Sequence, residues 1–151
     1  LSMTDKLGRS ELTKMLWNRL WGVHGQKILI ESKICLLSCE PAGVETVKNL
    51  ILPGVGSITI VDHNQVQDRD LGNNFFVTEE DIGKNRCDVK MFVIPHITIG
   101  VTKWLLELNP DVRGEAVNEN PAHLIDNNPE FFKKFDLIIS NDLSEVRKAR
   151  F

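Results

Sequence analysis

Residues 38–43 stand between an apolar run and a helical pattern, which is where an α/β fold can bind phosphate. In such a fold, glycines let the backbone approach a pyrophosphate, and the helix N-terminus offers unpaired N–H groups. The segment reads Ser38, Cys39, Glu40, Pro41, Ala42, Gly43 and keeps only the last glycine of G-x-G-x-x-G, which lets the helix pack on the strand. Ser38 and Glu40 take the two phosphate-facing positions, where Glu40 would set a carboxylate against an anion, and Pro41 lacks an N–H donor. We therefore predict a turn suited to packing rather than to phosphate.

Asp62, at the end of the next apolar run, is a second candidate ligand. At this position, a carboxylate of a dinucleotide-binding domain accepts hydrogen bonds from a ribose. Without the glycine turn this signal is weak, and we favour a strand-end cap or a relic over a working ligand. One alternative function is an NAD-dependent oxidoreductase, which suits Asp62 but not Glu40 and Pro41.

The elements that must position these residues follow from the spacing of apolar side chains. Residues 34–37 and 57–61 predict buried strands, and residues 44–51 predict a helix between them. A strand, a helix and a strand over about 30 residues make a βαβ unit with parallel strands. We therefore predict an α/β protein with a partial doubly wound (Rossmann-like), mainly parallel sheet flanked by helices.

Further elements are predicted on either side of this unit. An amphipathic helix is expected outside the sheet at about residues 10–22, with Ser10 as N-cap and Gly22 as its end. Later segments predict a helix near 101–108, a strand at 112–117, short helices after Asn120 and Asn128, and a last buried strand at 137–139. Because so few strands are visible, we expect either a truncated chain or a partner that covers the edge strand.

Composition excludes several kinds of partner. The chain has 151 residues, 42% hydrophobic and 26% charged, with 18 Lys and Arg against 21 Asp and Glu. This is an ordinary single-domain composition, and the absence of a dominant basic cluster argues against a nucleic-acid partner. No apolar stretch reaches the length of a membrane span, and no secretory pattern is present. We expect a protein of the cytoplasm, with the nucleus as a further compartment, and no membrane partner.

Other reactive side chains do not predict catalysis or metal binding. The cysteines, Cys35, Cys39 and Cys87, are odd in number and form no Cys-x-x-Cys pair, which predicts reduced thiols. Cys39 stands at a predicted helix N-terminus, but no histidine is near it in the sequence, so we do not assign it as a nucleophile. The histidines show no metal-ligand spacing. We predict no catalytic and no metal-binding residue.

Residues 47–62, which read VKNLILPGVGSITIVD, couple a helix end, a turn and the ribose-type aspartate. On this run the sequence resembles the ubiquitin-like modifier-activating enzymes, whose bacterial members are the ThiF/MoeB adenylyltransferases. Segments 71–76, 81–86 and 127–132 look like the regulatory (non-catalytic) subunits of neddylation-activating enzymes in that family, of the amyloid-precursor-protein-binding type. The resemblance implies that residues 1–151 are the N-terminal part of one pseudo-adenylation domain, with an insertion at about 91–100.

Active members of this family adenylate the modifier's C-terminal carboxylate, and they need cations on the phosphates of ATP and an aspartate on magnesium. The resemblance places Asn73 at a family arginine, Arg86 at the catalytic lysine, and the metal aspartate at or near Leu143. With the glycine turn also lost, the resemblance implies no adenylation by this chain alone and no cofactor in it. The vestigial nucleotide-site positions are Ser38, Glu40, Gly43, Asp62, Asn73 and Arg86.

The resemblance also implies a partner. A degenerate copy pairs with a catalytic subunit in a heterodimer, and that subunit carries ATP and magnesium for activation of the ubiquitin-like modifier. Candidate partner-facing residues are Arg19, Trp21, Asn73, Asn74, Phe75 and Phe76.

Some of these assignments have alternatives. The tryptophans, Trp17, Trp21 and Trp104, have helical spacing that also fits a core, which we favour for them. Residues 68–70 are expected to form a solvated charge cluster. A rival function is an active ATP-dependent adenylyltransferase whose glycine turn has drifted but still works.

Overall fold

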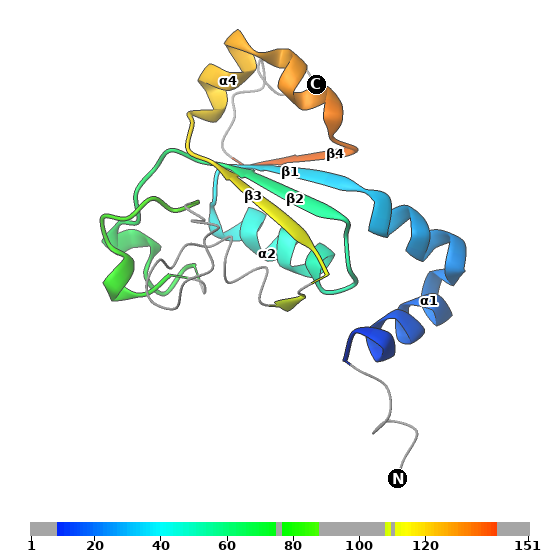
Figure 1. Cartoon of the computed structure of the whole chain (residues 1–151). Helices are drawn as coiled ribbons and strands as arrows, with labels where there is room; N and C mark the ends of the chain where they lie inside the picture. The colour runs from blue at the N-terminus through cyan, green and yellow to red at the C-terminus, as the bar shows by residue number, and fades with distance from the viewer. Residues whose placement is uncertain (1–8, 75–76, 88–107, 110, 142–151) are drawn as a thin grey trace, which may run out of the picture.

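A single parallel sheet organises the chain, and the computed structural model describes residues 9–74, 77–87, 108–109 and 111–141 (Figure 1). The strands are β1 (Lys33–Leu37), β2 (Ser57–Val61), β3 (Arg113–Val117) and β4 (Leu137–Ser140), in the order β3-β2-β1-β4. All three pairings are parallel, and this order is that of one half of a doubly wound sheet. The predicted α/β class and parallel sheet are confirmed.

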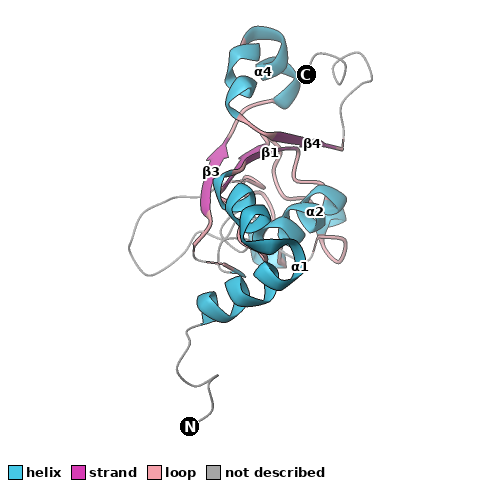
Figure 2. Cartoon of the chain, turned by 90° about the vertical axis from the view of Figure 1, so that its right-hand side faces the viewer, coloured by secondary structure: helices cyan, strands magenta, loops and turns pink. Residues whose placement is uncertain are grey.

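β1 is buried because helices cover the sheet on both faces (Figures 1 and 2). Ile34 and Leu36 pack in one core cluster with the apolar side of α2 (Pro41–Ile51). Cys35 and Leu37 pack in a second cluster with residues from α4 (Pro121–Asn127) and the 3-10 helix η4 (Pro129–Lys134). Alternate residues of β1 therefore pack into the two core clusters on opposite faces of the sheet, which explains the continuous apolar run.

α2 begins directly after the turn, with Pro41 in its first turn and Glu40 as N-cap. Its buried residues are Gly43, Val44, Val47 and Ile51. A Cβ atom on Gly43 would lie 2.7 Å from Leu36 Cδ1 and would also overlap Asn141. Gly43 therefore has the packing role that the sequence predicted for it.

β4 differs from the prediction of a buried strand. Leu137 is 45% exposed, and the other residues of β4 are half-buried. Among the described strands, β4 pairs with β1 alone, so its other edge has no neighbour there. It is less covered than β1 because β1 has a strand on each side.

α1 (Arg9–Glu31) is longer than the predicted helix at 10–22. Gly22 interrupts it with φ 76° and ψ 167°, but the helix resumes and reaches Glu31. The second half is anchored on the domain: Gln26 Nε2 donates to Pro53 O at 2.8 Å, and Leu29 packs against the core. Figure 1 shows the first half leading away from the sheet.

The predicted apolar stripe of α1 is not packed against the sheet. Met15, Leu16, Leu20 and Val23 are 46%, 65%, 67% and 74% exposed. Trp21 stacks on Trp17 with ring centroids 4.8 Å apart and is itself 39% exposed, so the core interpretation of Trp21 is wrong. The predicted helix is present, and its first half lies outside the sheet as expected (Figure 1).

The two Asn-Pro pairs begin different kinds of helix. Asn120 caps α4, because its Oδ1 accepts from Ala122 N at 2.9 Å and from His123 N at 3.4 Å. Asn128 precedes η4 without a side-chain capping bond. The second predicted short helix is a 3-10 helix, with an i→i+3 bond from Phe135 N to Phe132 O at its end.

Several predictions fall on residues outside the described part of the chain. They concern the insertion at about 91–100, most of the predicted helix at 101–108, and the side chains of Phe75, Phe76, Trp104 and Leu143. Within the described residues, none of the helices combines the length and apolar content that a membrane crossing requires.

Candidate functional site

Arg86 lies at the centre of a charged cluster beside the carboxyl ends of β1 and β2. Its Nη1 atom donates to Glu40 Oε1 at 3.0 Å and to Asp70 Oδ1 at 3.3 Å, and its Nε atom lies 3.1 Å from Asp62 Oδ2. The Arg86 side chain is only 1% exposed. A guanidinium buried to this extent requires carboxylate partners. Arg86 is thus paired within the protein at the position implied for a catalytic lysine.

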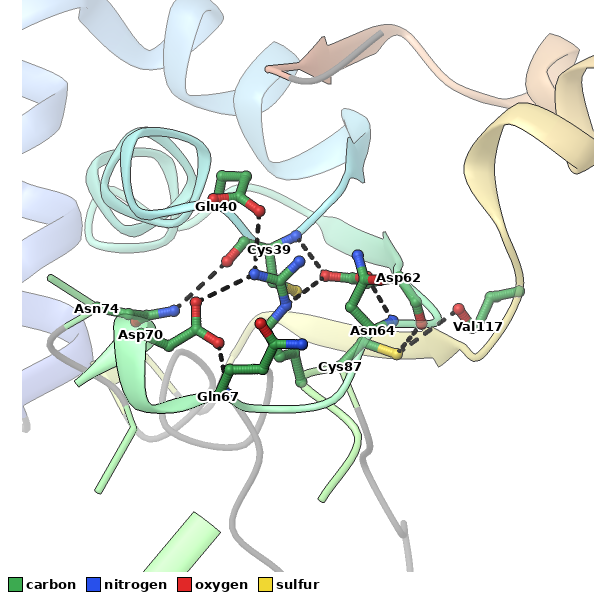
Figure 3. A network of polar contacts seen from close by, with 10 residues as sticks. Cys39, Glu40, Asp62, Asn64, Gln67, Asp70, Asn74, Cys87 and Val117 are labelled. Carbon is green, nitrogen blue, oxygen red and sulfur yellow. Dashed lines mark hydrogen bonds and ion pairs between the residues drawn. The ribbon is translucent and has the colours of Figure 1, made fainter. Parts of the chain in front are cut away.

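Asp62 ends β2 and is fully buried. Its Oδ2 atom accepts a hydrogen bond from Cys39 N at 2.8 Å, and its Oδ1 atom accepts one from Asn64 N at 2.9 Å (Figure 3). With Arg86 beside it, both carboxylate oxygens are engaged inside the chain. These contacts support the strand-end cap that the sequence favoured over a ribose ligand.

Asp70, in the 3-10 helix η2 (Asp68–Asp70), is a member of the cluster that the sequence analysis missed. Its Oδ2 atom accepts from Gln67 N at 2.9 Å, while its Oδ1 atom faces Arg86. Asp70 is 4% exposed, so the expectation of a solvated cluster at residues 68–70 is wrong for this residue. The ion pair with Arg86 explains why this carboxylate turns inward.

The two asparagines after η2 face different ways. Asn74 is 2% exposed, and its Nδ2 atom donates to Cys39 O at 3.4 Å, so the surface position predicted for Asn74 does not hold. Asn73 is exposed, and its Nδ2 atom donates to Arg69 O at 3.0 Å. Asn73 therefore lies on the surface and is not part of the charged cluster.

The turn after β1 keeps a glycine-like backbone without the glycine. Ser38 has φ 69°, in the left-handed region that favours glycine, and its N–H donates to Val61 O at 2.9 Å. Ser38 is also buried, at 8% exposed. The turn therefore retains the left-handed residue of a phosphate-binding loop but places a side chain on it.

The charges of the cluster do not fit the phosphates of a nucleotide. One guanidinium faces three carboxylates, which leaves an excess of negative charge. Burial alone disfavours the charged guanidinium, but Asp62, Glu40 and Asp70 outweigh it, and the pKa of Arg86 is raised. A triphosphate here would meet carboxylates and a cation that is already paired.

The three cysteines are buried thiols outside any disulfide, and Cys87 Sγ donates to Asp62 O at 2.8 Å. Burial raises the pKa of the Cys35 thiol to about 12 against the opposing charge of Lys134. Burial, with Asp62 adding to it, raises the pKa of Cys39 well above its ordinary value. A nucleophile requires a thiolate, which burial disfavours at both positions. Over the described residues, no group of three or more His, Cys, Asp and Glu is arranged to hold a metal ion.

The structure brings together Ser38, Glu40, Asp62 and Arg86, with Gly43 in the adjoining first turn of α2. Asn73 is the described member of the predicted set that lies apart. Nothing in the sequence pointed to Asp70, because its pairing with Arg86 joins residues 16 positions apart across a loop.

A family model described as the ThiF family matches residues 13–142, and the chain therefore belongs to this family. Within the family, the chain is similar to NEDD8-activating enzyme E1 regulatory subunits. It is 42% identical to that of Gallus gallus over 146 residues and 46% identical to that of Xenopus laevis over 132 residues, or 95% and 87% of this chain. It is also 45% identical over 127 residues, 84% of this chain, to the Arabidopsis thaliana subunit AXR1. The resemblance stated from the sequence is confirmed.

The matched region is a minor part of these relatives. It covers 25%, 23% and 22% of the Gallus, Xenopus and Arabidopsis proteins, so this chain spans about a quarter of their length.

Solved structures show the same fold at low sequence identity. The tRNA N6-threonylcarbamoyladenosine dehydratase TcdA of E. coli, in complex with ATP, matches with a TM-score of 0.73 at 18% identity, over 92% of this chain and 52% of TcdA. E. coli MccB with AMPCPP and MccA matches with a TM-score of 0.62 at 21% identity, over 87% of this chain and 36% of MccB.

Proposed function

We propose that this chain is part of the regulatory, non-catalytic subunit of an enzyme that activates a ubiquitin-like modifier in the neddylation pathway. Its role is to bind a catalytic ThiF-type subunit, and ATP and magnesium belong to that subunit. The names of the relatives support this role, although the chain spans about a quarter of their length.

The observation that carries the proposal is the buried guanidinium of Arg86 at the edge of the sheet where a doubly wound fold binds ligands. Adenylation requires cations that are free to neutralise charge on the phosphates as it develops. In this chain the central cation is already paired with three carboxylates. A domain with such a cluster is suited to supporting a partner rather than to holding ATP.

The first half of α1 supports the binding role. Arg19 is exposed, and the apolar side chains of Leu16 and Leu20 project from the same segment with 65% and 67% exposure. Trp21 adds an aromatic side chain of the kind that is enriched in binding hot spots. A projecting helix with this many exposed apolar side chains is typical of a surface that another protein covers.

ATP–pyrophosphate exchange tests the proposal. The purified chain should give no exchange by itself, whereas it should form a complex with the catalytic subunit of a NEDD8-activating enzyme. Binding is measured by isothermal titration, with an unrelated ThiF-type protein as control for specificity. Robust exchange by the chain alone would overturn the non-catalytic role. Absence of binding would contradict the assignment of the catalytic subunit as the partner.

Titration with magnesium and ATP separates this proposal from an active adenylyltransferase. The active enzyme should bind with micromolar affinity, while the proposed regulatory subunit should show no saturable heat. A parallel titration followed by NADH fluorescence addresses the oxidoreductase alternative.

A further inference from the structure

The segment between β2 and residue 87 returns to the sheet as a paired loop. Val66 N donates to Lys84 O at 2.8 Å, and Gly83 N donates back to Val66 O at 2.9 Å. Gln65 and Asn85 form an antiparallel bridge. Backbone hydrogen bonds therefore join the two described arms of the loop, and the first arm carries η2 and the exposed Asn73.

Arg86 is the cation that joins this loop to the sheet. It contacts Glu40 in the turn after β1, Asp62 at the end of β2 and Asp70 in η2. The Nε and Nη2 atoms are buried and have no hydrogen-bond partner, so the two hydrogen bonds of Nη1 and the ion pair with Asp62 set the position of the guanidinium. One side chain thus connects three separate segments.

Arg86 lies beside the carboxyl ends of the strands, where doubly wound sheets bind their ligands. In the order β3-β2-β1-β4, the direction of the strand order reverses between the paired strands β1 and β4, and ligands of doubly wound sheets bind outside the carboxyl ends of strands at such a point. The turn that follows β1 at this point is the one that carries Glu40. A side chain of the chain itself is therefore placed where the fold would otherwise hold a ligand.

We propose that Arg86 is a positioning residue that substitutes for a ligand beside the carboxyl ends of β1 and β2 and fixes the loop that carries η2 and Asn73 against the sheet. Its charge offsets carboxylates that would otherwise repel one another, and this holds η2 in place. The loop surface is thereby preformed without nucleotide. That this surface faces the catalytic subunit is the one step that rests on the proposed function.

Site-resolved hydrogen exchange of the chain tests the positioning role. The informative amides are Cys39 and Asn64, which donate to Asp62, and Gln67, which donates to Asp70. In Arg86→Met these amides should exchange at least about tenfold faster, because the carboxylates lose their buried counter-ion. Amides in the ladder between β1 and β2 should change little. Arg113→Met, at an exposed arginine of β3, is the matched control and should leave the cluster amides unchanged.

Two further variants separate positioning from general stability. Arg86→Lys keeps the charge but not the forked geometry, so it should give intermediate exchange with an intact ladder even if Arg86→Met does not fold. In Arg86→Ala, millimolar guanidinium chloride should restore protection of the cluster amides, whereas sodium chloride at the same concentration should not. The proposal is overturned if the cluster amides of Arg86→Lys exchange as in the wild type, or if they and the ladder accelerate equally.

Binding to the catalytic subunit is measured separately on the same variants. If the exchange pattern is as expected while the wild-type chain does not bind, the positioning role stands and the proposed function fails. If the wild type and Arg86→Lys bind equally although the loop of Arg86→Lys exchanges faster, the loop surface does not face the catalytic subunit.

Discussion

Arg86 and Asp62 form an ion pair in which the side chains are 1% and 0% exposed, with Nε and Oδ2 3.1 Å apart. Charges this far from water are stable only while they are paired, because removal of one partner leaves the other uncompensated. The pair also lies where β2 meets the turn after β1, since Asp62 accepts a hydrogen bond from Cys39 N. Loss of this ion pair should therefore destabilise both the end of β2 and the turn after β1.

Asp62→Asn should lower the free energy of unfolding by about 3 kcal/mol, because it leaves Arg86 without its most buried partner and turns one acceptor into a donor. Urea unfolding followed by tryptophan fluorescence measures the change. Asp68→Asn, at an exposed carboxylate nearby, is the control and should stay within about 0.5 kcal/mol of the wild type. Equal stability of Asp62→Asn and the wild type would contradict a structural role for this pair.

Substitutions at Ser38 should report the left-handed backbone of its turn. Ser38→Gly should be neutral or stabilising by up to about 1 kcal/mol, because glycine adopts the observed φ of 69° without steric cost. Ser38→Val should destabilise by about 2 kcal/mol, since a β-branched residue is strongly disfavoured there. Thermal unfolding of the two variants provides the comparison. The reverse order would show that the side chain matters more than the backbone.

Asp81 should make stability depend on pH in the acid range. Burial raises the pKa of this carboxyl, but hydrogen bonds from Thr78 N and Oγ1 at 2.9 and 2.8 Å, with Lys84 nearby, outweigh it and lower the pKa. The folded state then binds the proton less tightly than the unfolded state does. The stabilisation is thus complete above the ordinary aspartate pKa of about 4 and is lost as the pH falls through the lower folded value.

Asp81→Asn tests this linkage by urea unfolding at a series of pH values. The difference from the wild type should be about 1–2 kcal/mol at neutral pH and should shrink below about pH 4. Glu79→Gln, at an exposed neighbour in the same 3-10 helix η3 (Glu79–Asp81), is the control. A difference that stays constant across this range would rule out the carboxylate as its source.

The cysteines should resist alkylation in the folded chain. Burial raises the pKa of Cys35 to about 12 and that of Cys39 well above its ordinary value, and Cys87 is buried as well. At pH 8, iodoacetamide should therefore label them only after the chain is unfolded in urea, as mass spectrometry can measure. Rapid labelling of Cys39 in the native chain would instead favour a reactive thiol at the N-terminus of α2.

The exposed half of α1 should matter for binding and little for folding. Leu20→Ser should leave stability within about 0.5 kcal/mol, because Leu20 is 67% exposed, and should weaken binding to the catalytic subunit by about 1–2 kcal/mol. Lys27→Ser, at an exposed position beyond Gly22, is the matched control. If Leu20→Ser binds as well as Lys27→Ser, this face does not contact the catalytic subunit.

Local patterns in the sequence were sufficient to predict the centre of the fold. The apolar run of β1, the helical spacing of α2 and the close packing of Gly43 each depend on residues a few positions apart, and the structure agrees with all three. The parallel sheet followed because a strand, a helix and a strand connect in few ways.

The charged cluster and the surface of α1 could not be predicted in the same way. Arg86 pairs with Glu40 and Asp70 across 46 and 16 residues, and no periodicity marks such pairs. The spacing of Leu16 and Leu20 is the same whether a helix covers its own core or another molecule. Charge pairing at a distance and the identity of a covering surface are properties of the folded chain, not of short segments.

The projecting half of α1 should affect how long the protein persists in the cell. Apolar side chains that stay in water while a protein is unaccompanied attract chaperones and proteases. Chains made in excess of the protein that covers Leu16 and Leu20 should therefore be degraded quickly. The steady-state amount of this chain should then follow the amount of that binding protein.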